Sequence, residues 1–219
     1  MLRAMSPEAD FQRARSPEQR EARRRAILGA AAELLAEAPL AEISLRELAR
    51  RVGLSKTNVV RYFETREAVF FALLNQSIED WLAELPAELP DGDPAAVIDA
   101  LARSLARRPL LCELWSALGT QLERNLSAAA VRDFKLANAV LQAELAELIG
   151  ARAPALSPAA AREFVSMMIL LIAGLWPFAN PSASVTEAVR DPRLAGSRVD
   201  FAARLSRYLQ VALAGLGAR

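Results

Sequence analysis

The chain has 219 residues, 53% of them hydrophobic and 24% charged, so it can bury a substantial core and does not have the composition of a disordered protein. It contains no histidine and one cysteine, Cys112, which excludes an internal disulfide, removes histidine-dependent catalysis and leaves almost no possible zinc site. The net charge is +1, but residues 1–66 hold thirteen Lys and Arg against nine Asp and Glu, while residues 67–219 hold fourteen against seventeen. A basic front joined to an acidic remainder is typical of a protein that meets a polyanion with one part only.

The first 25 residues contain charges and prolines but no apolar segment of the kind that a secretory signal requires. The longest apolar run, VSMMILLIAGLW at 165–176, is shorter than the roughly 20 residues that a membrane-spanning helix needs. We therefore expect a soluble, cytoplasmic protein that does not enter a membrane.

Helix signals recur along the chain, and no segment alternates apolar and polar residues for long, which predicts an all-α fold. Ser16, Ser44 and Ser55 each stand where a capping residue begins a helix, and Gly53 supplies a turn between the second and third helices. The four helices expected in the first part of the chain cover 17–37, 44–51, 55–62 and 65–85.

Beyond a loop that begins at Pro86, prolines and glycines divide the rest of the chain into further helices. Pro177, Pro181 and Pro192 predict an irregular connection ahead of the last one. These helices are expected at 94–106, 109–125, 127–149, 158–176, 185–190 and 199–215.

The second and third helices, joined by the glycine turn, form the pattern of a helix-turn-helix. The first helix is expected to pack against both and complete a small three-helix core. Val59 and Phe63 are expected to anchor the short third helix inward. The side chains that then face outward, and that suit phosphates and base edges in a DNA major groove, are Lys56, Thr57, Asn58, Val60, Arg61 and Tyr62. The alternative is an ordinary helical corner whose polar face is solvated.

Residues 23–74, RRRAILGAAAELLAEAPLAEISLRELARRVGLSKTNVVRYFETREAVFFALL, resemble the N-terminal domain of the tetracycline-repressor (TetR) family. The shared pattern is Ser-x-Arg-Glu-Leu-Ala, then Val-Gly-Leu-Ser-Lys, the aromatic pair Tyr62-Phe63, and Thr65-Arg66-Glu67 at the start of the next helix. The resemblance implies a homodimeric transcription factor with an N-terminal three-helix DNA-binding domain and a larger helical C-terminal domain that binds an effector and dimerises. We expect no catalytic residue, no cofactor and no metal.

This implied organisation has a flexible basic arm at 1–16 and a DNA-binding domain at 17–66. The latter continues into a linker helix at 66–85, and the effector-binding and dimerisation domain covers 67–219. Several arginines either extend the DNA footprint as a basic arm or form a solvated helix face balanced by Glu18 and Glu21. They are Arg13, Arg15, Arg20, Arg23, Arg24 and Arg25.

By position, the resemblance implies that Ser44 and Arg46 contact the DNA backbone, that Tyr62 contacts phosphate, and that Arg66 is a basic phosphate anchor. The full set expected at the DNA is Ser44, Arg46, Ser55, Lys56, Thr57, Asn58, Val60, Arg61, Tyr62 and Arg66. Thr57 stands where many members have glycine, and Val60 where many have a phosphate-binding tyrosine. We therefore expect Val60 to make at most an apolar contact, for example with a thymine methyl group.

The apolar run at 165–176 has no polar side, which predicts a helix buried all round, either inside the domain or at a subunit interface. The last helix has one apolar stripe, composed of Phe201, Leu205, Tyr208, Leu209, Ala212 and Leu213. Pairing the helices at 158–176 and 199–215 with their symmetry mates would give an isologous four-helix dimer interface. Packing of both helices within one chain is the alternative. A symmetric dimer predicts a pseudo-palindromic DNA operator.

An effector pocket is expected where large and polarisable side chains gather in the C-terminal domain, although simple core packing is the alternative. The candidates are Trp81, Cys112, Trp115, Leu118, Phe134, Met167, Met168 and Trp176. Glu113, Gln121 and Asn138 are the polar groups that could orient a ligand, unless they are solvated surface positions. This lining predicts an apolar or aromatic small molecule. Cys112 is expected to be inert packing rather than a redox sensor.

The leading hypothesis is a repressor whose effector changes the separation of two recognition helices, which must lie about 34–36 Å apart to enter successive grooves. Two other classes stay open. One is an enzyme that uses carboxylates such as Asp80, Glu84 or Asp99, which the absence of histidine disfavours. The other is a helical small-molecule or lipid-binding protein without DNA binding.

Overall fold

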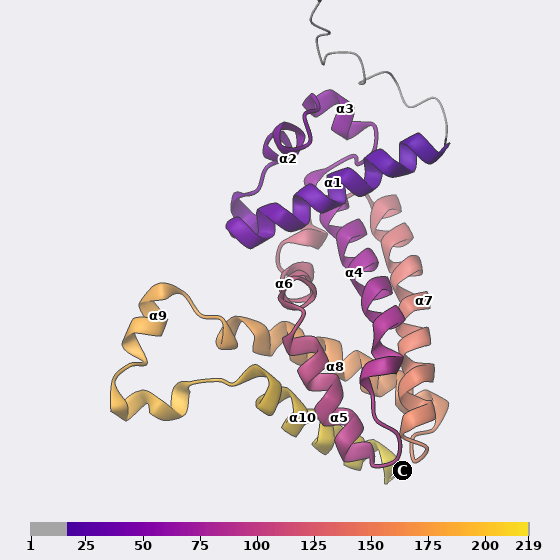
Figure 1. The fold of residues 1–219 in the computed structure, drawn as a ribbon, viewed down its shortest axis with the longest axis vertical. Helices are drawn as coiled ribbons and strands as arrows, with labels where there is room; N and C mark the ends of the chain where they lie inside the picture. The colour runs from indigo at the N-terminus through magenta and orange to yellow at the C-terminus, as the bar shows by residue number, and fades with distance from the viewer. Residues whose placement is uncertain (1–16, 219) are drawn as a thin grey trace, which may run out of the picture.

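The computed structural model describes residues 17–218, and these residues form helices and connecting loops with no strand among them (Figure 1). The predicted arm at 1–16 lies outside the described residues. The α-helices are α1 (Pro17–Glu37), α2 (Leu45–Arg51), α3 (Lys56–Val60), α4 (Arg66–Glu88), α5 (Pro94–Ala106), α6 (Pro109–Leu118), α7 (Ala128–Arg152), α8 (Pro158–Ala179), α9 (Ala183–Ala188) and α10 (Phe201–Gly217). Three short 3-10 helices are η1 (Leu40–Glu42), η2 (Leu122–Asn125) and η3 (Pro192–Ser197). The all-α prediction is confirmed.

Helices α2, α3 and α4 begin at the capping residues that the sequence indicates, whereas Ser16, the cap expected for α1, lies outside the described residues. Ser44, Ser55 and Thr65 each accept a hydrogen bond from the backbone N–H three residues ahead, at 3.1–3.2 Å. Gly53 follows α2 with φ 65°, a left-handed conformation that favours glycine. The later helices are capped by the side chains of Asp93, Ser127, Ser157 and Asp200.

Several helix ends differ from the prediction: α7 and α8 extend to Arg152 and Ala179 rather than to 149 and 176, and α6 and α4 differ as follows. The helix expected at 109–125 ends at Leu118, because Gly119 weakens the helix there, and η2 follows as a separate turn. Helix α4 continues past Pro86 to Glu88, although proline lacks the N–H that this turn would use. Leu85 and Leu89 are 0% and 6% exposed, so packing of this last turn offsets the missing hydrogen bond.

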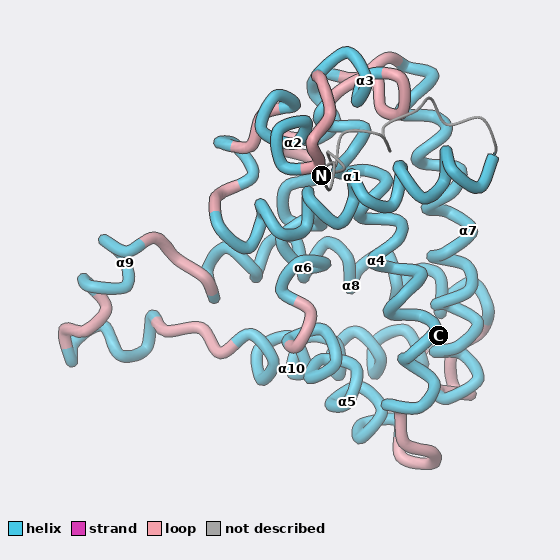
Figure 2. The backbone as a smooth tube through the Cα atoms, turned by 45° about the horizontal axis from the view of Figure 1, so that its top comes forward, coloured by secondary structure: helices cyan, strands magenta, loops and turns pink. Residues whose placement is uncertain are grey.

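The helices form two connected units (Figures 1 and 2). Helices α1, α2 and α3 lie together at one end of the molecule. Helix α4 begins there and runs into the C-terminal unit, where it contacts α5, α6 and α7. Helix α8 packs against α6, α7 and α10, and α10 packs against α5. The buried apolar side chains of both units belong to one continuous cluster, so the core does not break at the junction.

Helix α8 has an open apolar face. Only 33% of its most apolar 18-residue window is buried, and Met167, Leu170 and Phe178 are exposed, so burial all round inside the domain is excluded and burial at a subunit interface stays a prediction. By length and composition alone, α8 is long and apolar enough to cross a membrane. Core helices of soluble proteins can have the same length and composition, so this observation is weak evidence for a membrane.

A protruding arm joins α8 to α10 (Figures 1 and 2). It consists of α9, η3 and their flanking turns, and no residue of α9 or η3 is buried. The prediction of an irregular connection with one short helix is close to this arrangement, although α9 begins earlier than expected and η3 was not expected.

Candidate functional site

The short helix α3 is held by two buried side chains. Val59 is 0% exposed and Phe63 is 3% exposed, and the guanidinium of Arg24 lies 4.4 Å above the Phe63 ring. The backbone continues from α3 through a tight turn, in which the N–H of Tyr62 donates to the carbonyl of Val59 at 2.9 Å. The predicted inward anchors are confirmed, and they fix which side of α3 faces solvent.

The opposite side of α3 is open to solvent. Val60 is 42% exposed, which is high for a branched apolar residue, and Tyr62 is half-buried against the core of this unit. Ser44 and Ser55 are exposed, and their oxygens accept the capping hydrogen bonds, so each hydroxyl proton can still be donated. The remaining expected residues on this surface are exposed: Arg46, Lys56, Thr57, Asn58 and Arg61.

Three cations on this surface have no anionic partner. Among the described residues, Arg46, Lys56 and Arg61 form no ion pair within 4.0 Å. The neighbouring Arg50 is instead bound to Glu47 at 2.5 Å. We call the exposed side chains of residues 44–46 and 55–62 the outer HTH surface. Its uncompensated positive charge suits a polyanion such as the DNA backbone.

Arg51, which the sequence reasoning did not single out, fixes the angle between α2 and α1. Its guanidinium contacts Glu37 at 2.6 Å and Glu33 at 3.3 Å, both on α1. The hydrogen bond from Arg51 holds the pKa of the Glu37 carboxyl below its usual value. The i, i+4 spacing of the two glutamates places them on one face of α1, but no local pattern identifies a cationic partner fourteen or more positions away.

Arg66 has a different environment from the one expected of a phosphate anchor. One nitrogen of its guanidinium donates to the carbonyls of Leu40, Ala41 and Ile43 at 3.1–3.4 Å. Another donates at 3.0 Å to the carboxylate of Glu67, which is 6% exposed. The side chain therefore binds the segment that leads into α2, and we treat it below as a residue that positions the helix-turn-helix.

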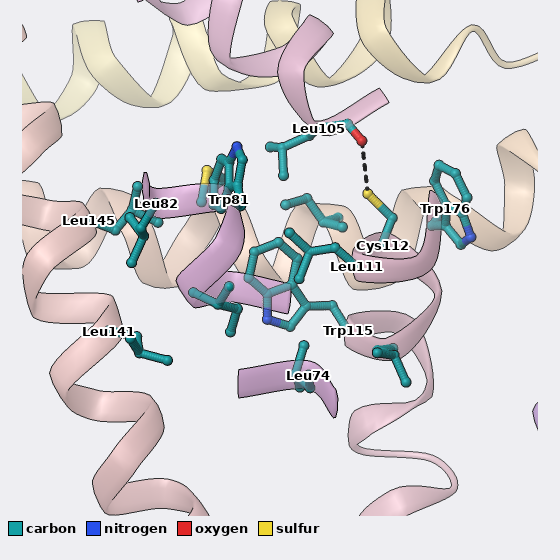
Figure 3. Close-up of a cluster of buried hydrophobic side chains, with 14 of the residues drawn as sticks. Leu74, Trp81, Leu82, Leu105, Leu111, Cys112, Trp115, Leu141, Leu145 and Trp176 are labelled. Carbon is teal, nitrogen blue, oxygen red and sulfur yellow. Dashed lines mark hydrogen bonds between the residues drawn. The ribbon is translucent and has the colours of Figure 1, made fainter. Parts of the chain in front are cut away.

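Four of the eight expected effector-site residues, Trp81, Cys112, Trp115 and Met168, are buried between α4, α6 and α8 and form what we call the aromatic cluster (Figure 3). The rings of Trp81 and Trp115 meet edge to face at 5.9 Å, and the indole of Trp81 donates to Ser104 at 2.9 Å. Cys112 and Met168 are both 0% exposed. Burial raises the pKa of the Cys112 thiol to about 12, which fits inert packing rather than a reactive thiolate.

The other four candidates lie outside this group, although Figure 3 shows Trp176 at the edge of the same buried region. Phe134 stacks on Phe71 at 4.0 Å, between α7 and α4, whereas Met167 is 37% exposed on the open face of α8. Trp176 lies near the end of α8 and donates to Glu113 at 2.9 Å. Leu118 and Gln121 are half-buried at the end of α6 and just after it.

Asn138 is buried rather than solvated. Its amide donates to Asn75 on α4 at 3.1 Å and accepts from Gln142 at 2.5 Å. This polar contact joins α7 to α4, and the described partners account for it without a ligand.

Comparison with known proteins adds independent findings. The family model described as bacterial regulatory proteins, tetR family, matches residues 27–73, and the model described as tetracyclin repressor-like, C-terminal domain, matches residues 75–219. The chain is 37% identical over 82 residues to the HTH-type transcriptional regulator RutR of Escherichia coli K12, a match that covers 37% of this chain and 39% of RutR. It is 39% identical over 69 residues to the HTH-type transcriptional regulator EthR of Mycobacterium tuberculosis H37Rv, which covers 29% of this chain and 32% of EthR.

Solved structures share the fold over nearly the whole chain. A TetR transcriptional regulator from Rhodococcus sp. RHA1 superposes with a TM-score of 0.56 at 21% identity, covering 88% of this chain and 96% of that one. The fatty acid degradation regulator FadR from Bacillus halodurans gives 0.56 at 14% identity, covering 88% and 98%. Because a single C-terminal model matches well over half of the sequence and the N-terminal model precedes it, this chain belongs to the TetR family of non-enzymatic, DNA-binding transcriptional regulators.

Proposed function

We propose that this protein is a cytoplasmic repressor that binds a pseudo-palindromic operator as a homodimer and leaves it when a small apolar or aromatic molecule binds the C-terminal domain. The observation that carries the proposal is the outer HTH surface. It combines a helix held by two buried anchors with three cations that have no ion-pair partner in the described chain.

At the operator, the outer HTH surface divides by chemistry into groups that position the protein and groups that read the sequence. Arg46 and the hydroxyls of Ser44 and Ser55 lie at or near the starts of their helices and suit phosphate oxygens. The exposed side chains of α3 and the turn after it suit base edges. Arg61 is the strongest candidate, because a guanidinium can donate two hydrogen bonds to one guanine. Val60 suits a thymine methyl group.

The homodimer is proposed to form through α8 and α10. Leu170 and Phe178 on α8 are 70% and 71% exposed, and Val211 on α10 is 59% exposed. The two helices pack against each other, so their exposed apolar side chains can form one continuous surface. A two-fold axis across it would bury these side chains in a four-helix interface.

Effector binding is proposed among the aromatic cluster of Trp81, Trp115 and their neighbours on α6 and α8. Helix α4 supplies Trp81 to this cluster and also packs against α1, so a change around the indole can reach the DNA-binding unit through one rigid helix. An effector acts only through its preference for one of the two arrangements of the dimer.

The test is DNA binding by the purified protein. Selection from a random oligonucleotide pool should return a pseudo-palindrome, and the affinity for it should fall steeply with salt as counterions are released from phosphates. Failure to bind any oligonucleotide at low ionic strength, with the protein folded and dimeric, would refute the proposal. Dimer formation without DNA binding would leave only the alternative of a small-molecule or lipid-binding protein.

A further inference from the structure

A cavity of about 470 Å³ lies where the DNA-binding unit meets the C-terminal unit. One wall is the end of α1 and the loop after it, a second is the first turns of α6, and the third is the end of α8. The side chains that shape it include Leu35, Pro39, Leu110, Glu113, Trp176 and Asn180. Figure 1 shows α6 between α1 and α8 at this place. Its volume falls within the range of small-molecule sites.

The lining of this junction cavity is mostly apolar, and its polar side chains include Glu37, Glu113 and Asn180. Glu113 is half-buried and accepts the indole N–H of Trp176 at 2.9 Å, which fixes the carboxylate at the cavity wall. Trp176 is itself held by the ring of Phe201, which meets it edge to face at 5.0 Å. The position of the carboxylate is therefore set by packing and needs no ligand to order it.

Glu113 also lacks a cationic partner. In the part of the chain that the structure describes, no Lys or Arg nitrogen lies within 4.0 Å of it. Glu88, another half-buried glutamate, is held by Arg107 and Arg108, each at 2.6 Å. Glu37, the other carboxylate in the cavity lining, is already bound by Arg51. Because a partly desolvated carboxylate is normally paired, the charge of Glu113 is left for a ligand to neutralise.

We propose that the junction cavity binds a small organic cation, with its apolar body against Leu35, Leu110 and Trp176 and its ammonium against Glu113. Such a ligand contacts both units at once and therefore favours one orientation of α1 relative to α6. Its binding must then change operator affinity, by the same factor by which the operator changes ligand affinity. This regulatory consequence rests on the proposed function, whereas binding in the cavity does not.

Binding can be tested by calorimetry with 1-naphthylmethylamine, which is cationic at pH 7, and with the neutral isostere 1-naphthylmethanol. We expect the amine to bind at least about tenfold more tightly, as an added charged hydrogen bond implies. Glu113→Gln keeps an acceptor for Trp176 and should abolish the preference. Glu144→Gln, a change at an exposed residue of α7, should retain it. Equal binding of the two compounds to the unmodified protein, or no binding of either, overturns the proposal.

The site can be located through the indole N–H signals of the three tryptophans in the NMR spectrum. The amine should shift the signal of Trp176, and Leu35→Trp, whose larger side chain fills the cavity, should prevent binding. Shifts confined to Trp81 and Trp115 would place the ligand in the aromatic cluster and refute the junction site. Operator affinity is measured separately. An operator affinity that saturating amine leaves unchanged refutes the regulatory step, whereas the absence of any DNA binding by the ligand-free protein refutes only the proposed function.

Discussion

Replacing Arg66 by alanine distinguishes two roles of this residue: positioning the helix-turn-helix within the fold, or contacting a DNA phosphate. The change removes the hydrogen bonds to the carbonyls of Leu40, Ala41 and Ile43 and the 3.0 Å contact with buried Glu67. One charged hydrogen bond contributes about 1.5–3 kcal/mol, and the longer carbonyl contacts contribute less. We therefore expect the free energy of unfolding to fall by about 2–4 kcal/mol. For a chain of this length that corresponds to a decrease in Tm of roughly 4–16 °C.

The second readout is the salt dependence of operator binding. If Arg66 contacts no phosphate, Arg66→Ala should leave the slope of log K against log salt unchanged, even where affinity falls because the start of α2 has moved. Arg46→Ala is the matched control, because Arg46 is exposed and has no ion-pair partner among the described residues. It should keep its Tm and flatten the slope by about 0.9 for each copy of the chain. The positioning role of Arg66 is refuted if the Arg66→Ala variant has a flatter salt slope and the same Tm as the unmodified protein.

Four further outcomes follow from the geometry. Arg61→Ala should cost about 1–3 kcal/mol on the selected operator and relax base preference, and equal losses on specific and random DNA would remove Arg61 from the base-reading set. Val59→Ala should lower the free energy of unfolding by about 1–3 kcal/mol, since it empties a fully buried position; an unchanged denaturation midpoint would contradict this. Cys112, with its pKa near 12, should resist dithionitrobenzoate at pH 8 until the protein unfolds, and rapid labelling of native protein would show that the thiol is accessible. In sedimentation velocity, Leu170→Glu should convert the dimer to monomers. The control Leu136→Glu, at a position 62% exposed on α7, should leave the dimer intact. Monomers from both variants, or from neither, would argue against the α8 interface.

The sequence predicted those parts of the fold and the site that depend on near neighbours. The caps at Ser44 and Ser55, the glycine turn and the inward direction of Val59 and Phe63 follow from spacings of a few residues, and the structure agrees with each of them. The exposure of Lys56 on α3 follows from the same periodicity, since a helix with one buried side must turn its other residues outward.

Features that depend on contacts between distant segments were not predictable in the same way. Arg66 has the spacing of a surface cation, and only the path of residues 40–43 across it reveals the carbonyls that it binds. Asn138 looked like a surface residue because nothing in its neighbourhood indicates that Asn75 lies opposite. The junction cavity is formed by three helices that are far apart in the chain, so its outline could not be read from any one of them.

Because helix α4 is long, a small rotation of it in the C-terminal unit produces a larger displacement in the DNA-binding unit. Its 23 residues form a rod about 35 Å long, with the start of the helix in the DNA-binding unit and Trp81 about two thirds of the way along it. Given that length, a rotation of the helix by about 5° about its C-terminal end displaces its N-terminal end by about 3 Å. In the homodimer that we propose, the two displacements add or cancel according to the direction of the tilt, so a small change around Trp81 would alter the separation of the two α3 helices.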